Sequence, residues 1–269
     1  MPEFTARDVQ ALRNLTGAGM MDAKRALTES DGDPAAAAKW LRERGLGKAA
    51  ERAGRESQEG AVAVSYDKAA NAIALVQLRS ETDFGAKSPD FVNLVNELAA
   101  LVASEGEDAV DQRKAAIEDL NIVTKENVQL GEVIRFRAAP GNIVDSYLHV
   151  QNDRGVNGVI VEISGGDQQL AHDLAVHIAF GKPKYLRRED VPAEEIEAER
   201  TTLETATRLE GKPDAQLPKI VEGKLGGWFK RVPGGVLLEQ PYAKDESQTV
   251  AKVLGQAKIV RFAQVVIGG

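Results

Sequence analysis

One pattern, two short β-rich runs followed by an amphipathic helix, occurs twice in this chain and constrains its fold more than any other feature. The first copy begins near Gly60 with AVAVSYDKAANAIALVQL, and its helix opens at Ser88-Pro89. The second copy is NIVDSYLHVQNDRGVNGVIVEIS followed by DQQLAHDLAVHIAF. Alternation of apolar and polar residues around a polar turn indicates a β-hairpin. A repeated hairpin-plus-helix unit therefore predicts an α+β fold with two antiparallel sheets, each covered by a helix.

The two copies differ in how the strand connects to the helix. LVQL at 75–78 aligns with IVEI at 160–163, an offset of 85, whereas the helices align with an offset of 76. The first copy thus carries about nine additional residues, among them Thr82, Asp83 and Phe84. A large aromatic is unusual in a turn, where small polar residues dominate. Because the second copy forms without these residues, they are predicted to serve something outside the fold.

Residues 1–54 are predicted to form a three-helix unit with a linker. Thr5 and Asp8 have the spacing of a capping box, and the glycines of TGAGM interrupt the helical pattern. Asp33-Pro34 predicts the start of a third helix, which is expected to end at Gly45. The polar stretch GKAAERAGRESQEG is then read as the linker to the first repeat, placed at 55–140.

The second repeat, at 141–182 plus 228–269, is predicted to contain an inserted helical hairpin at 187–227. A thin apolar stripe marks each of its helices. In the first helix the stripe is Ile196, Leu203 and Ala206, and in the second it is Leu217, Ile220, Val221 and Leu225. The runs GGVLLEQPY and AKIVRFAQVVIGG are expected to return as strands to the second sheet.

Composition and local motifs point away from an enzyme. The net charge is −7 and there is no cysteine, which argues against a surface built mainly for nucleic acid and excludes thiolate sites. No Walker A loop, dinucleotide-binding glycine pattern, GxSxG or HExxH occurs. His172 and His177 are five apart on one predicted helix, too far around it to share a metal ion. No cofactor or metal is predicted, and the lack of an apolar leader or spanning stretch predicts a cytoplasmic protein with no membrane partner.

Two functional alternatives remain open on the residues alone. A three-helix domain could belong to an adaptor that binds peptides or ubiquitin-like proteins. The pair Glu81 and Asp83 could serve a hydrolase, but that chemistry would require a concave site and a perturbed carboxylate pKa.

Three stretches resemble one family along the whole chain. They are LRNLTGAGMMDAKRALTESDGD, ETDFGAKSPDF and GKPKYLRREDVPAE with LLEQPYAKDESQTV, and they resemble bacterial elongation factor Ts. The resemblance implies a guanine-nucleotide exchange factor for the GTPase elongation factor Tu, without a reacting group or bound nucleotide of its own. It also implies an N-terminal domain of ubiquitin-associated type, a two-part α+β core and an inserted antiparallel coiled coil. Many members continue into a further C-terminal helix that contacts the GTPase, and this contact is expected to be missing here.

The resemblance also implies which residues reach the partner. Asp83 and Phe84 correspond to the pair that enters the GTPase domain near its magnesium site, and Thr82 shapes their turn. Met20, Met21 and Lys24 match an N-terminal contact with the GTPase domain. His149 matches a histidine that approaches Tu. The alternatives without a partner are that Met21 belongs to the core and Met20 caps the helical hairpin, that His149 is an ordinary surface histidine, and that the Phe84 ring is tucked under its own loop.

Overall fold

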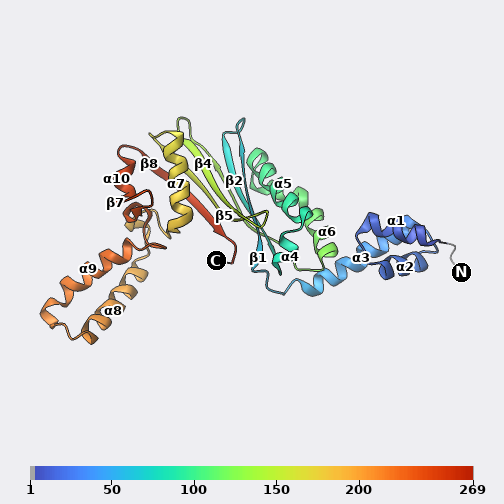
Figure 1. Cartoon of the computed structure of the whole chain (residues 1–269), viewed down its shortest axis with the longest axis horizontal. Helices are drawn as coiled ribbons and strands as arrows, with labels where there is room; N and C mark the ends of the chain where they lie inside the picture. The colour runs from blue at the N-terminus through green and yellow to red at the C-terminus, as the bar shows by residue number, and fades with distance from the viewer. Residues whose placement is uncertain (1–3, 269) are drawn as a thin grey trace. The chain divides into compact units, whose positions relative to one another are not determined.

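The computed structural model describes residues 4–268 and divides the chain into two compact units (Figure 1). One unit holds the chain up to Arg135 together with Val150–Val156 and the chain from Val265 onward. The other holds Phe136–His149 and Asn157–Gln264. Mixed helices and antiparallel sheets confirm the predicted α+β class. The four boundaries predicted from the sequence are finer than this division and stay predictions.

The first unit opens with three packed helices, α1 (Ala6–Thr16), α2 (Met20–Glu29) and α3 (Pro34–Arg52). Thr5 begins α1 with the predicted capping box, and Gly17 ends it in the left-handed region at φ 67°. Asp33 caps α3 and Pro34 occupies its first turn, also as predicted. The small core of this part is mostly alanine and leucine, with Leu12 and Leu27 fully buried.

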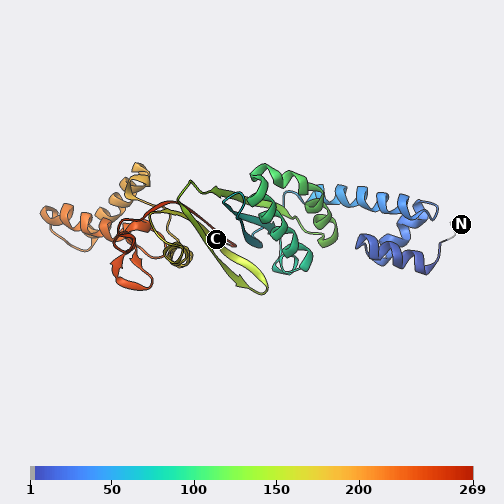
Figure 2. The same ribbon diagram turned by 90° about the horizontal axis from the view of Figure 1, so that it is seen from above.

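Helix α3 does not end at Gly45 as predicted but continues to Arg52, so the first part of the expected linker is helical (Figure 2). A Cβ atom at Gly45 would lie 2.7 Å from Cγ2 of Ile122 on α6 (Lys114–Thr124). The glycine therefore serves a close approach between two helices and is not a helix stop.

The first repeat follows these three helices along the chain. Strands β1 (Glu59–Asp67) and β2 (Ala72–Ser80) form the predicted antiparallel hairpin, and β3 (Gln129–Arg137) joins β2 to give the order β1-β2-β3. Helix α5 (Pro89–Glu105) covers the sheet and buries Phe91, Leu98 and Val102. A 3-10 helix, η1 (Glu107–Arg113), leads from α5 to α6. Neither α6 nor β3 was predicted.

The second repeat has the same order of elements, with β4 (Ile143–Gln151), β5 (Arg154–Ser164) and α7 (Gln168–Gly181). The C-terminal strand β8 (Lys258–Val266) returns to the sheet as predicted, in the order β4-β5-β8. The prediction for GGVLLEQPY is wrong: it forms a 3-10 helix, η4 (Leu237–Glu239), and the short strand β6 (Pro241–Tyr242). Strand β6 pairs with β7 (Asp245–Thr249) in a separate two-stranded sheet, followed by α10 (Val250–Leu254).

A helical hairpin interrupts the second repeat, with α8 (Ala193–Leu209) and α9 (Leu217–Phe229) side by side (Figure 1). Two 3-10 helices, η2 (Arg188–Asp190) and η3 (Asp214–Gln216), precede α8 and α9. On α9 the predicted Leu217, Val221 and Leu225 are buried. On α8 the predicted Ala206 is exposed, and the neighbouring Thr207 is buried instead. The buried hydroxyl of Thr207 donates to the carbonyl oxygen of Leu203 at 2.6 Å and accepts a hydrogen bond from Nζ of Lys224 at 3.2 Å.

Across residues 4–268, none of the helices has both the length and the apolar composition required to cross a bilayer.

Candidate functional site

The connection between β2 and α5 contains a four-residue helix, α4 (Asp83–Ala86), that presents the side chain of Phe84 to solvent. The ring is 82% exposed, which is extreme for an aromatic residue. The nearest charged group over its face is Nζ of Lys87, 5.6 Å from the ring centroid. The alternative of a ring tucked under its own loop is therefore wrong. A ring of this size buried in a partner would contribute roughly 1.5–3 kcal/mol by loss of water contact.

Two successive helix N-caps determine the backbone conformation of the connection. Thr82 is extended and accepts a hydrogen bond at its hydroxyl from the backbone N–H of Gly85, at 3.2 Å, which starts α4. Ser88 then caps α5, and its hydroxyl also donates to the carbonyl oxygen of Gly85 at 2.8 Å. The chain thus makes one helical turn, stops and restarts in a new helix. Phe84 lies in the first of these turns, outside the core.

A half-buried carboxylate, Glu126, holds this turn from the opposite side. It follows α6 and accepts three hydrogen bonds, one from Ser80 at the end of β2 and two from Thr82 in the connection. Its oxygens receive the hydroxyl of Ser80 at 2.6 Å, the backbone N–H of Thr82 at 3.1 Å and the hydroxyl of Thr82 at 2.5 Å. A Cβ atom at Gly85 would lie 2.5 Å from Oε2 of Glu126, so a glycine is needed for the carboxylate to reach the turn.

The carboxylates of the hydrolase alternative are both engaged in structural contacts. Glu81 accepts the backbone N–H of Asn127 at 2.6 Å and lies 3.5 Å from Nη1 of Arg55. Asp83 accepts a hydrogen bond from Lys87, which lowers the pKa of Asp83 against a smaller opposing effect of desolvation. A general acid at neutral pH requires the opposite shift. The geometry therefore gives the hydrolase alternative no support.

The other residues that sequence reasoning selected lie at the surface. Met20 and Met21 begin α2 and are 45% and 75% exposed, so the alternative that Met21 belongs to the core is wrong. Lys24, one turn further along α2, is also exposed. His149 is exposed near the end of β4. The described contacts place Thr82, Asp83 and Phe84 together and leave the two methionines on the neighbouring three-helix part of the same unit.

The two histidines of α7 have separate structural environments. Nδ1 of His172 lies 3.3 Å from Oδ1 of Asp145 at the surface. His177 is buried; its Nδ1 accepts the backbone N–H of Ala243 at 3.1 Å, and its Nε2 lies 3.0 Å from Oε1 of Gln240. Among residues 4–268 there is no group of three or more His, Cys, Asp or Glu side chains that could hold a metal ion.

Comparison with known proteins assigns the family. The sequence model described as Elongation factor TS matches residues 81–269. Elongation factor Ts of Renibacterium salmoninarum is 42% identical over 282 aligned positions that span 100% of both chains. The proteins of the same name from Streptomyces griseus and Micrococcus luteus are also 42% identical, over 280 and 284 positions and again along 100% of both chains. This chain belongs to the elongation factor Ts family. It therefore acts in translation elongation.

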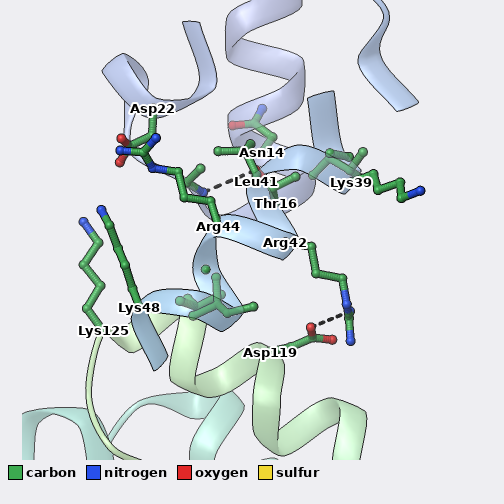
Figure 3. A pocket seen from close by; sticks show the side chains of 18 of the residues that line it. Asn14, Thr16, Asp22, Lys39, Leu41, Arg42, Arg44, Lys48, Asp119 and Lys125 are labelled. Carbon is green, nitrogen blue, oxygen red and sulfur yellow. Dashed lines mark hydrogen bonds and ion pairs between the residues drawn. The ribbon is translucent and has the colours of Figure 1, made fainter. Parts of the chain in front are cut away.

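The chain also contains a cavity of about 840 Å³ that sequence reasoning did not find. It lies in the first unit between the three N-terminal helices and α6 (Figure 3). Lys48 and Lys125 are among its lining residues, and Arg42 pairs there with Asp119 at 2.7 Å (Figure 3). Neither Glu81 nor Asp83 is among the residues that line it.

Sequence reasoning also missed Glu126. The residue lies 44 positions from Thr82 and carries no local motif, so only the packing of α6 beside the turn reveals its role. The single local signal was Gly85, whose lack of a side chain is explained only once Glu126 is seen beside it.

Proposed function

We propose that this member of the elongation factor Ts family is the guanine-nucleotide exchange factor for elongation factor Tu. It would bind the GDP form of Tu, insert Asp83 and Phe84 near the magnesium and phosphate site, promote GDP release and stabilise nucleotide-free Tu until GTP binds. One observation carries the proposal: Phe84 is 82% exposed on a turn that several hydrogen bonds hold in place. A fixed, exposed aromatic is suited to fill a pocket in a partner.

The proposed mechanism needs no bond chemistry in this chain. A P-loop GTPase holds GDP through backbone amides that contact the phosphates and through a magnesium ion. Displacement of the elements that hold the metal weakens both interactions. By thermodynamic linkage, a protein that weakens GDP binding must itself be bound less tightly when GDP is present, by the same factor. The protein is then no enzyme in the usual sense, because it changes binding equilibria and has no reacting group.

Secondary contacts complete the proposed interface. Met20, Met21 and Lys24 are exposed together at the start of α2, so two apolar side chains and one cation are available to the GTPase domain. His149 is proposed as a further contact, supported by its exposure on β4. A cytoplasmic location is proposed with this function, since translation elongation takes place there. The adaptor alternative rests on the three N-terminal helices alone, and no contact in the structure favours it.

The proposal is tested by release of a fluorescent GDP analogue from elongation factor Tu. This protein is expected to speed release strongly, and a complex with Tu is expected to dissociate when GDP or GTP is added. An adaptor would instead keep nucleotide-insensitive partners. If the protein binds Tu but leaves GDP release at its spontaneous rate, the exchange function is wrong.

A further inference from the structure

We infer that Glu126 is a positioning residue for nucleotide exchange: its carboxylate holds the turn of Thr82, Asp83 and Phe84 in the orientation that presents the aromatic ring. The inference rests on the proposed function and adds a residue outside the turn itself. It starts from the three hydrogen bonds that Glu126 accepts from Ser80 and Thr82.

The donors surround the start of the turn and fix it from more than one direction. Ser80 is the last residue of β2, fully buried, and Thr82 is the residue on which α4 begins. Hydrogen bonds to an ionised acceptor are shorter and stronger than neutral ones. Because both the backbone and the hydroxyl of Thr82 are bound, the residue cannot rotate away without losing two of these bonds. Because Phe84 is only two residues further on, fixing Thr82 also fixes the direction in which the Phe84 ring points.

The residue after Glu126 fixes the same segment to the chain that follows α3. Asn127 is buried, and its Nδ2 donates to the carbonyl oxygens of Ala53 and Arg55 at 3.3 and 2.7 Å. Its backbone N–H donates to Glu81 at 2.6 Å. The pair Glu126 and Asn127 therefore joins the Phe84 turn to the end of the three-helix part.

Helix α6, which leads into this pair, packs directly on those N-terminal helices. Its Ile122 fills the space above Gly45, and the carbonyl oxygen of its Asn121 accepts Nη2 of Arg52 at 2.9 Å. Arg42 and Asp119 form the ion pair seen in Figure 3. The Phe84 turn is thus connected through α6 to α3, and α3 packs on α2, whose surface is proposed to contact Tu. Glu126 is the point where this connection reaches the turn.

Two replacements separate the role of the acceptor oxygens from that of the charge and volume. In Glu126→Gln, the amide oxygen can still accept from Ser80 and from the N–H of Thr82, and the amide group can donate to the Thr82 hydroxyl. In Glu126→Ala, the donors of Thr82 and Ser80 lose their partner. The matched control is Glu132→Ala, because Glu132 is an exposed glutamate of β3 that hydrogen-bonds through its backbone N–H, to Gln77, and not through its side chain within the described residues.

The experiment has two arms on the full-length protein. The first measures backbone amide order by NMR relaxation at Asp83, Phe84 and Gly85 in the free protein. The second measures release of the fluorescent GDP analogue from Tu at saturating concentrations of each variant. Glu126→Ala is expected to lower amide order in the turn and to slow assisted release by roughly tenfold or more, whereas Glu126→Gln retains most of both and Glu132→Ala retains all.

A double-mutant cycle distinguishes positioning from general structural support. In a Phe84→Ala background, Glu126→Ala is expected to slow release little further, because the side chain that it positions is already missing. If the two losses simply add, or if Glu126→Ala keeps full amide order and full activity, the inference is overturned. If wild type does not speed release at all, the proposed function fails. The amide order of Glu126→Ala then decides alone whether Glu126 holds the turn.

Discussion

The two repeats connect the second strand of the hairpin to the following helix in different ways. Residues 81–88 connect β2 to α5, whereas residues 165–167 connect β5 to α7. By these bounds, five of the roughly nine surplus residues of the first copy lie in the connection, and the others lengthen β2 and the start of α5. The short connection needs one side-chain cap, in which Asp167 accepts the N–H of Leu170 at 2.8 Å. The long one has two caps and an acceptor, Glu126, from the segment that follows α6.

The difference between the two connections separates residues that the fold requires for packing from residues that it does not require. In the second repeat the connection serves packing, since the space beside Gly166 is filled by Ile163 and Leu170. In the first repeat the corresponding hydrogen bonds hold a turn whose aromatic side chain packs on no core. Hydrogen bonds thus order the turn while Phe84 itself contributes no buried apolar surface, which is the expected state of a side chain kept for a partner.

Alanine at the glycine of each connection should separate presentation from packing, with the largest effect in the first repeat. In Gly85→Ala the new methyl group would meet the carboxylate of Glu126 at 2.5 Å and displace it, so assisted GDP release is expected to fall about tenfold or more. In Gly166→Ala the methyl group meets Cδ1 of Ile163 at 2.8 Å, which affects stability and leaves assisted release unchanged. Stopped-flow fluorescence and urea unfolding measure the two quantities. Equal losses of exchange in both variants would contradict the comparison.

Removal of the helix caps should test the same difference between the two repeats, with a smaller effect on assisted GDP release. Thr82→Ala removes the cap of α4 and one bond to Glu126, and is expected to slow assisted release several-fold. Asp167→Ala removes the cap of α7 and is expected to cost about 1 kcal/mol of unfolding free energy without slowing release. The result that would break the comparison is a loss of exchange in Asp167→Ala that matches that of Thr82→Ala.

The smallest effect concerns pH and belongs to the second repeat. Burial lowers the pKa of His177 below 6.5, partly opposed by its hydrogen bond to Gln240. The unfolded chain therefore binds this proton more readily than the folded one, so stability is full above about pH 6.5 and falls as the pH drops below it. The decrease in unfolding temperature between about pH 7.5 and 5.5 is expected to shrink in His177→Gln. An unchanged slope in His177→Gln would contradict this account of the pH dependence.

Much of the fold could be predicted because its signals are local. Capping at Thr5, Asp33 and Ser88 and the repeated apolar periods depend on residues within a few positions of each other. The predictions that were wrong depend instead on contacts between residues far apart in the sequence. Gly45 was read as a helix end because its reason, Ile122, lies far along the chain. The 3-10 helix within GGVLLEQPY likewise follows from contacts rather than from an apolar run, since Leu237 is fully buried beside the end of α7.

The residues of the candidate site also differ in whether a local sequence signal reveals them. Phe84 stood out because an aromatic residue in a surplus turn conflicts with local expectation, and its exposure agrees with that reading. Glu126 could not be found from the sequence, because a single glutamate after a helix is ordinary and its partners lie 44 and 46 positions away. The residues that present a contact are therefore easier to read from a sequence than the residues that hold it.

The most direct measurement of the central claim compares two exposed phenylalanines. Phe84 lies on the surplus turn, and Phe180, 63% exposed, lies near the end of α7 in the second repeat. Release of a fluorescent GDP analogue from elongation factor Tu would be followed with wild type, Phe84→Ala and Phe180→Ala. Phe84→Ala is expected to lose about 2 kcal/mol, or roughly thirtyfold, of the acceleration while it still binds Tu, and Phe180→Ala to match wild type. Full acceleration by Phe84→Ala would contradict the account.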